Sequence, residues 1–341
     1  MYNKSETVKA GDEMITVPTP TVAEYEKKNI QRDANFVGFI LLAFLVGQLL
    51  VGVLLGFGQM LGFLDFSKAD YGLGPMGYTL FAMLIYILWV GIPVLVVALI
   101  ARRKQNPFPT CRVPRGTYGL AVFGGMAMSL LANFVAGYVM QFFSTLGVPY
   151  PELTDQYDPT VLNLVLNLIS TAVVPALLEE MAMRGYILHA LLPYGKKAAV
   201  IITAILFGLI HGNVLQLPFA FILGLVMGWL TVQTGSIWPA VVFHFTNNAH
   251  SVIISWAEQF TDKSGEITEI SFFGFCIVGA VLFLASFLQK RGEWSDLLRP
   301  IGNGNHPFPL SQRVTTIITA PAFLAGGIVW LIVLLAASLP K

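Results

Sequence analysis

The sequence predicts an all-α, polytopic helical membrane protein, and three observations lead to this fold class. Of the 341 residues, 55% are hydrophobic and 11% are charged, about half the charged share of an ordinary soluble domain. The mean hydropathy is +0.71. Apolar runs long enough to cross ~30 Å of hydrocarbon, at ~1.5 Å per helical residue, recur along the chain. One soluble core could not bury this much apolar surface, so we expect about 8–9 transmembrane helices.

Nine apolar segments are the candidates for these helices. They begin near Phe36, Gly77, Tyr118, Val161, Ala198, Leu217, Ile237, Ser271 and Val314. The fifth and sixth are short and interrupted by glycine, so they are the least secure. No repeat of 20–50 residues is apparent. We therefore expect a helical membrane domain over residues 36–341, preceded by a polar cytoplasmic tail over residues 1–35 with no signal-peptide pattern.

The basic residues give these segments an orientation. If all nine cross the membrane, the lysines and arginines of the connecting loops fall on one side, which the positive-inside rule makes the cytoplasm. These residues are Lys4, Lys9, Lys27, Lys28, Arg32, Arg102, Arg103, Lys104, Arg112, Arg115, Lys196, Lys197, Lys290, Arg291, Arg299 and Arg313. The loops 149–159 and 257–269 are acidic and fall on the other side. We expect a multi-pass cell-membrane protein with its N-terminus in the cytoplasm and its C-terminus outside.

Charge and cysteine content argue against several functions. The net charge of +1 favours neither nucleic acid nor a strongly acidic partner. Cys111 and Cys276 lie in unrelated contexts and neither begins a C-x-x-C motif, so no disulfide framework is expected. Neither cysteine lies near the polar membrane segments, and no G-x-S-x-G elbow occurs. A cysteine or serine nucleophile is therefore not favoured.

The fourth segment keeps three charges near its middle, although one charge at the centre of a spanning helix costs at least ~2.5–3.5 kcal/mol. Glu180 and Arg184 are four residues apart, so they can pair on one helix face. Glu179 lies ~100° round the helix from that pair and has no local partner. Pro175 frees the carbonyl oxygen of Thr171, so we expect the helix to bend or open just before the charges.

Two further polar pairs have the same spacing of four residues. They are Phe207 with His211, and His244 with Asn248. Each pair is weak alone, because a buried histidine is usually a satisfied core residue and a membrane asparagine often bonds between helices. Likewise, the Glu180 charge could belong to a purely structural ion-pair network. Three such pairs on neighbouring segments instead favour a shared site.

Helix lengths predict how deep these residues lie. Glu179 and His211 are about equally far from the turn at Lys196 and Lys197, so we expect them to meet at mid-membrane depth. His244 reaches them only if its helix tilts or starts deeper than the apolar pattern indicates.

A carboxylate and two imidazoles in a partly dry cavity suit hydrolysis. Glu179 could take a proton from water with the help of an imidazole, while buried donors stabilise an amide oxyanion. Alternatively, Glu179, His211 and His244 could bind Zn²⁺ and leave a fourth position for water. The H-E-x-x-H signature of many zinc peptidases is absent.

The order of these pairs resembles a known family. EEMAMR at 179–184, FGLIH at 207–211 and HFTNN at 244–248 resemble the EExxxR, FxxxH and HxxxN boxes of the CPBP family. This family comprises the CAAX-processing and bacteriocin-processing intramembrane proteases, also called Abi proteins. The resemblance covers a motif-bearing core at about residues 160–260, and the remaining segments carry no motif that matches.

The resemblance implies a helical membrane endopeptidase with a CAAX-protease-like core. Glu179 would activate water with the help of His211, and His244 with Asn248 would stabilise the oxyanion or act as ligands. The supporting residues would be Glu180, Arg184 and Phe207. The cofactor would be zinc or none, held if present by Glu179, His211 and His244. The substrate would be a membrane-associated protein or peptide in the lipid bilayer, of bacteriocin-like, signal-peptide-like or CAAX-like type.

Two other classes of function stay open on the sequence. A non-catalytic membrane scaffold or bacteriocin self-immunity factor would share the fold, although loss of a box would have favoured it and all three are present. An ion-coupled transporter would also keep intramembrane Glu, Arg and His residues, but no inverted repeat is visible.

Overall fold

The chain is described as a computed structural model over residues 5–10, 13–18, 21–68, 70–100, 106, 108–147, 160–260, 263–289, 301–302 and 306–337. Its first elements are two short strands, β1 (Ser5–Ala10) and β2 (Glu13–Pro18), which pair as an antiparallel hairpin. The elements that follow in the described ranges are helical. The predicted all-α membrane domain is therefore confirmed, with a small hairpin in the preceding tail.

The long first helix, α1 (Val22–Met60), begins well before the apolar run at Phe36. A capping box starts it: the Thr21 side chain accepts from the Glu24 N–H, and the Glu24 carboxylate accepts from the Thr21 N–H. The polar residues after Thr21 thus form the first turns of α1.

The other helices follow in chain order. They are α2 (Gly74–Tyr86), η1 (Ile87–Gly91), α3 (Ile92–Ile100), α4 (Arg115–Gly119), η2 (Leu120–Gly124), α5 (Gly125–Thr145), α6 (Val161–Asn167), η3 (Leu168–Val173), α7 (Val174–Glu180), η4 (Met181–Leu188), α8 (His189–Leu191), η5 (Leu192–Tyr194), α9 (Lys196–Ile210), α10 (Leu217–Thr234), α11 (Trp238–Ala257), α12 (Ser264–Gln289), α14 (Leu310–Ile318) and α15 (Pro321–Ala337). The segments η1 to η4 are π-helical and η5 is a 3₁₀ turn. Each of the nine predicted segments contains a helix.

Within the described ranges, six helices are long and apolar enough to cross a membrane, and a seventh span results if α14 and α15, bent by 68°, are taken together. The chain is thus a multi-pass membrane protein. The two candidates that do not qualify are α9, which has 15 residues, and α11, whose middle carries histidine and asparagine. These are the helices of the two histidine boxes. Neighbouring helices enclose them, so they need not be apolar all round.

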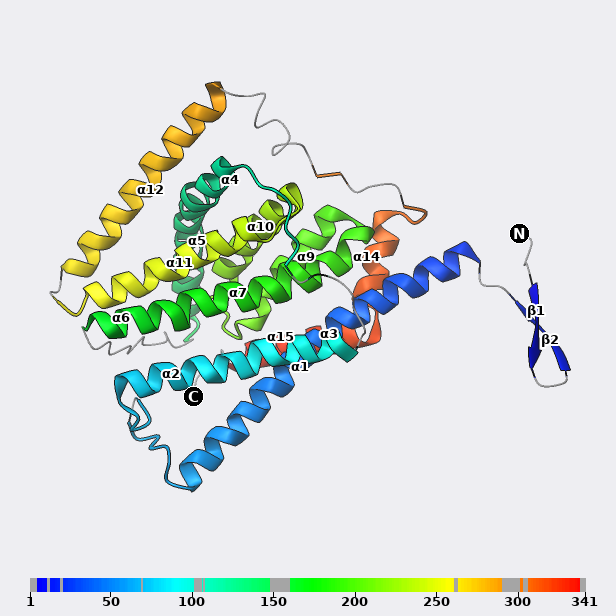
Figure 1. Cartoon of the computed structure of the whole chain (residues 1–341), viewed down its shortest axis with the longest axis horizontal. Helices are drawn as coiled ribbons and strands as arrows, with labels where there is room; N and C mark the ends of the chain where they lie inside the picture. Colours follow the sequence, from blue (N-terminus) through cyan, green and yellow to red (C-terminus); the bar gives the residue numbers. More distant parts are fainter. Residues whose placement is uncertain are drawn as a thin grey trace.

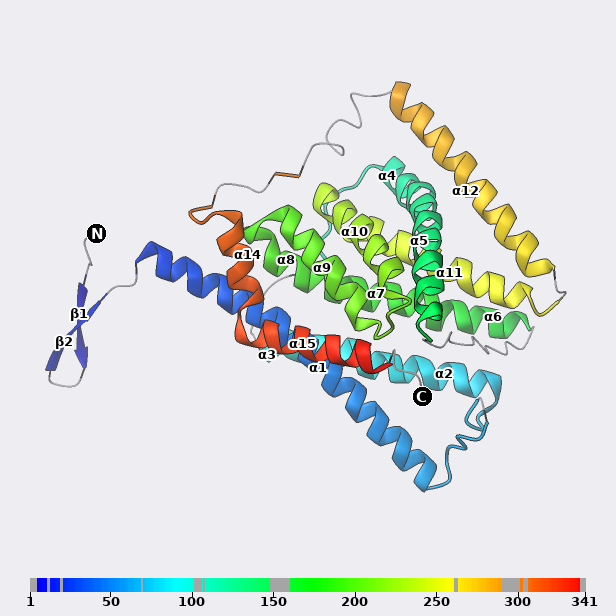
Figure 2. The same cartoon turned by 180° about the vertical axis from the view of Figure 1, so that it is seen from behind.

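Figures 1 and 2 show how the other helices surround α9 and α11. The segments α7, α9, α10 and α11 lie at the centre, with α5 and α12 on one side and α1, α2, α3 and α15 on the other. The site boxes of the sequence therefore lie in the interior of the bundle.

Helix α15 runs parallel to α1 and packs tightly against it. The Ala322 N–H donates to the Asn35 side chain over 2.9 Å. Further along both helices, the Trp330 indole N–H donates to the Leu41 carbonyl over 2.9 Å. A Cβ on Gly38 would lie 2.1 Å from the Ala322 backbone, so only glycine permits this approach. The N-terminal end of α1 and the C-terminal end of α15 consequently lie at opposite ends of the bundle.

Several residues used to orient the chain lie outside the described residues. These are Lys4, Arg102, Arg103, Lys104, Lys290, Arg291 and Arg299, together with the whole acidic loop 149–159.

Candidate active site

The helix opens before the charges, as predicted. The π-helical segment η3 ends at Val173, and the Val174 N–H donates to the Ile169 carbonyl, five residues back. Pro175 follows and leaves the Thr171 carbonyl without a helical donor. The Asn248 amide, from α11, donates to this carbonyl over 3.1 Å. Asn248 therefore joins two helices at the opening.

Two of the three charges form a buried pair. The Arg184 Nη1 donates to Glu180 Oε1 over 2.8 Å, and both side chains are fully buried. The Arg184 Nη2 donates to the Gly224 carbonyl over 3.2 Å. The guanidinium also lies over the Phe207 ring, 4.7 Å from its centroid, in a cation–π contact. The predicted partnership of Glu180 and Arg184 is confirmed, and it extends to α9 and α10.

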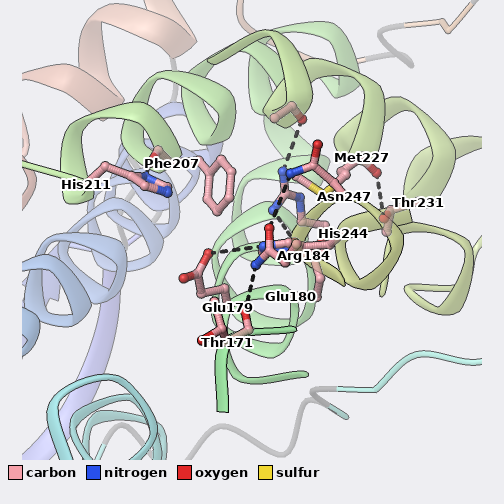
Figure 3. Close-up of polar contacts among 12 residues, drawn as sticks. Thr171, Glu179, Glu180, Arg184, Phe207, His211, Met227, Thr231, His244 and Asn247 are labelled. Carbon is pink, nitrogen blue, oxygen red and sulfur yellow. Dashed lines mark hydrogen bonds and ion pairs between the residues drawn. The ribbon is translucent and has the colours of Figure 1, made fainter. Parts of the chain in front are cut away.

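His244 lies between the two glutamates (Figure 3). Its Nδ1 is 3.0 Å from Glu180 Oε1, so this nitrogen carries the proton that it shares with the carboxylate. In the neutral imidazole, Nε2 is then an acceptor, and it lies 3.8 Å from Glu179 Oε2. Helix α11 thus brings His244 to the depth of Glu179. The apolar pattern of the sequence alone did not predict this depth for His244.

His211 ends α9 and has a fixed tautomer as well. Its Nδ1 is 2.6 Å from the Phe207 carbonyl, which can only accept, so Nδ1 donates and Nε2 is left as an acceptor. The Phe207 ring lies between the two imidazoles, at 4.9 Å from His211 and 5.8 Å from His244 (Figure 3). It meets both rings almost at right angles, at 83° and 86°. Phe207 therefore holds the imidazoles apart.

Glu179, the third charge of this segment, has a different environment from the buried pair of Glu180 and Arg184. The Tyr86 hydroxyl, from α2, donates to its Oε1. Its Oε2 is buried, accepts no hydrogen bond, and is the oxygen that faces His244. The side chain is 12% exposed. One oxygen of this carboxylate is thus held in place, and the other is open to a small polar molecule.

All three boxes meet at one cavity of about 230 Å³, which we call the polar cavity. It is lined by Tyr86, Thr171, Pro175, Glu179, Phe207, His211, Gln216, Phe219, Ala220, Leu223, Met227, His244, Asn247 and Asn248. Every residue predicted for the chemistry lines it. Glu180 and Arg184 lie behind its wall and are fully buried.

Two residues at this cavity were not predicted from the sequence. Besides Tyr86, Asn247 takes part in a chain of hydrogen bonds: the Ser129 hydroxyl donates to Asn247 Oδ1 over 2.5 Å, and Asn247 Nδ2 donates to Asn248 Oδ1 over 3.2 Å. This chain fixes which end of the Asn248 amide faces Thr171. The signals were a tyrosine in mid-span, where tyrosines of membrane helices are uncommon, and a second asparagine within the HFTNN box.

The residues do not form a metal site as they stand. In the part of the chain that the structure describes, no three His, Cys, Asp or Glu side chains lie close enough together to hold a metal ion. Glu179 and His244 are neighbours, but His211 is on the far side of the Phe207 ring. The spacing of donors therefore does not fit the predicted zinc ligand set.

The comparison with protein families gives a match over residues 161–250, to the family described as type II CAAX prenyl endopeptidase Rce1-like. The resemblance to the CPBP family is confirmed. Comparisons with curated proteins and with solved structures found no match.

The match covers the part of the chain that carries the three boxes, from the start of α6 into α11. It indicates a CAAX-type intramembrane endopeptidase, which is a hydrolase of peptide bonds. Tyr86 and Ser129 contribute to the site from helices outside the matched segment.

Proposed function

We propose that the protein is an intramembrane endopeptidase in which Glu179 activates the attacking water. One observation carries this proposal: Glu179 Oε2 lies 3.8 Å from His244 Nε2 at the polar cavity. Glu179 Oε2 is buried and accepts no hydrogen bond from the protein. A water molecule that donates to both atoms would present its oxygen lone pair to a substrate carbonyl. Positioned general bases of this kind contribute ~10²–10⁴ to a rate.

The proposed steps conserve protons. Water adds to the carbonyl carbon of the scissile amide while its proton passes to Glu179. The second N–H of the Asn248 amide, which Thr171 does not use, is the proposed donor to the oxyanion. The intermediate then collapses, the C–N bond breaks, and Glu179 returns the proton to the leaving amine. In this proposal His244 takes the place of His211 as the second acceptor for water, and His211 lines the same cavity.

The position of the cavity among membrane helices favours a membrane-associated substrate. We propose a peptide or protein segment of bacteriocin-like, signal-peptide-like or CAAX-like type, reached from the lipid bilayer. The parallel course of α1 and α15 supports ends on opposite sides of the bundle. From the positive-inside rule we propose that the N-terminus is the cytoplasmic one.

Cleavage of membrane-anchored peptides tests the proposal. The full-length protein, purified into lipid nanodiscs, is incubated with a library of anchored peptides, and new termini are identified by mass spectrometry. We expect defined cleavage sites that are absent with the Glu179→Gln variant. Equal products with both proteins would contradict the proposed role of Glu179, and products that also form with empty nanodiscs would come from a contaminant.

Zinc dependence remains open to direct test. Since His211 stands apart from the other two donors, we expect cleavage to continue after prolonged chelation, in a preparation shown to be metal-free by elemental analysis. Loss of cleavage on chelation, restored by Zn²⁺ alone, would mean that Glu179, His211 and His244 approach one another when a metal is bound.

A further inference from the structure

A second cavity meets the polar cavity at Glu179. This aromatic cavity has a volume of about 220 Å³ and is lined by Phe44, Tyr86, Trp89, Val90, Glu179, Ile210, His211 and Trp330. Tyr86, Glu179 and His211 line both cavities. Whatever occupies the aromatic cavity therefore lies within contact of the carboxylate that is proposed to activate water.

The far wall of the aromatic cavity offers a ligand no hydrogen bonds. The Trp89 indole N–H donates to the Phe44 carbonyl over 3.0 Å, and the Trp330 indole N–H donates to the Leu41 carbonyl over 2.9 Å. Both donors are thus used on the backbone of α1. The remaining lining there, Val90 and Ile210, is aliphatic. Only the three residues shared with the polar cavity are polar.

Apart from Ile210 of α9, this wall is built by helices outside the family match and is closely packed. Phe44 comes from α1, Val90 from η1 and Trp330 from α15. A Cβ on Gly47 would lie 2.9 Å from the Trp89 carbonyl, so α1 and η1 are in backbone contact beside the cavity. Such packing gives the cavity a fixed size.

We propose that the aromatic cavity is a specificity subsite that receives one apolar side chain of the substrate, from a residue that flanks the cleaved bond. The inference rests on the proposed function. Pockets for whole small molecules are typically ~300–1,000 Å³, so this smaller cavity suits a single side chain such as leucine, methionine or phenylalanine. A charged side chain would lose its water there without gaining a partner on the far wall.

The test measures the preference of the enzyme at each position beside the cut. The full-length protein in nanodiscs is given the anchored peptide library with both flanking positions randomised, and cleaved products are sequenced. We expect leucine, methionine or phenylalanine to exceed alanine by ~10-fold or more at one flanking position, since each methylene in an apolar pocket is worth ~10–200-fold.

Two variants connect that preference to this cavity. Val90→Phe fills it, so we expect the preferred residue at that position to change to alanine or glycine. Phe44→Leu enlarges it, so the preference should move toward the larger apolar side chains. Leu99→Phe on α3 adds the same ring at a site that is 68% exposed on the bundle surface and should leave the preference unchanged.

The outcomes separate this inference from the function on which it rests. Cleavage with no apolar preference, or a preference that neither cavity variant moves, would overturn the subsite and leave the endopeptidase intact. Absence of cleavage of every peptide by the wild-type protein would overturn both. A change of preference in Phe44→Leu alone would suffice to support the subsite if Val90→Phe did not fold.

Discussion

Glu179→Gln is expected to lower the rate of peptide cleavage by ~10²–10⁴ and to leave the stability of the protein nearly unchanged. Glutamine has the shape of glutamate but cannot accept a proton at neutral pH. Its amide oxygen can still accept from the Tyr86 hydroxyl, so the side chain keeps its place in the wall of the cavity. The loss should therefore appear in kcat rather than in folding.

The rate is measured with one peptide from the library that the wild-type protein cleaves. Stability is measured as the melting temperature of the protein in the same lipid nanodiscs. Glu266→Gln, an identical change at an exposed position of α12, is the matched control and should behave as wild type. Undiminished cleavage by Glu179→Gln would remove this carboxylate from the mechanism. A variant that loses both melting temperature and activity would make the residue structural.

The sequence predicted the local parts of the site because they depend on helix geometry alone. Residues four apart share a face, which placed Glu180 beside Arg184. Pro175 cannot donate, which predicted a free Thr171 carbonyl and an opening of the helix just before the charges. The identity of that partner, Asn248, required the packing of α11 against η3.

Contacts between distant segments were beyond such reasoning. Tyr86 bonds to Glu179 across 93 positions of sequence and belongs to a segment with no recognised motif. Asn247 lies inside the HFTNN box but ~100° round the helix from Asn248, so a pattern of four-residue spacings passes over it. Its role depends on Ser129, from a third helix.

The zinc prediction stays a prediction, because the motifs bring its three residues to one cavity without fixing the distances between them. Three boxes at one depth place Glu179, His211 and His244 around one cavity. They do not reveal that the Phe207 ring stands between the imidazoles. The phenylalanine of the FxxxH box, which carries no reactive group, thus separates the two imidazoles.

Arg184→Leu is expected to destabilise the protein by ~3–5 kcal/mol, because it leaves the Glu180 charge buried without its cation. Both side chains are fully buried, so no water can replace the lost guanidinium. The variant should express poorly or melt early. Lys68→Leu removes one partner of an exposed pair with Asp65, whose side chains are 62% and 48% exposed, and should leave the melting temperature almost unchanged.

The double variant Glu180→Leu with Arg184→Leu should recover part of that stability, because it leaves no isolated charge. Recovery should be incomplete, since the His244 Nδ1–H and the Gly224 carbonyl each lose a partner, and an unsatisfied buried group costs ~1–3 kcal/mol. Cleavage should not return, because Glu180 is the acceptor that fixes the tautomer of His244. If the double variant were no more stable than the less stable of the two single variants, the two residues would not be energetic partners. Arg184 would then act mainly through the Gly224 carbonyl and the Phe207 ring.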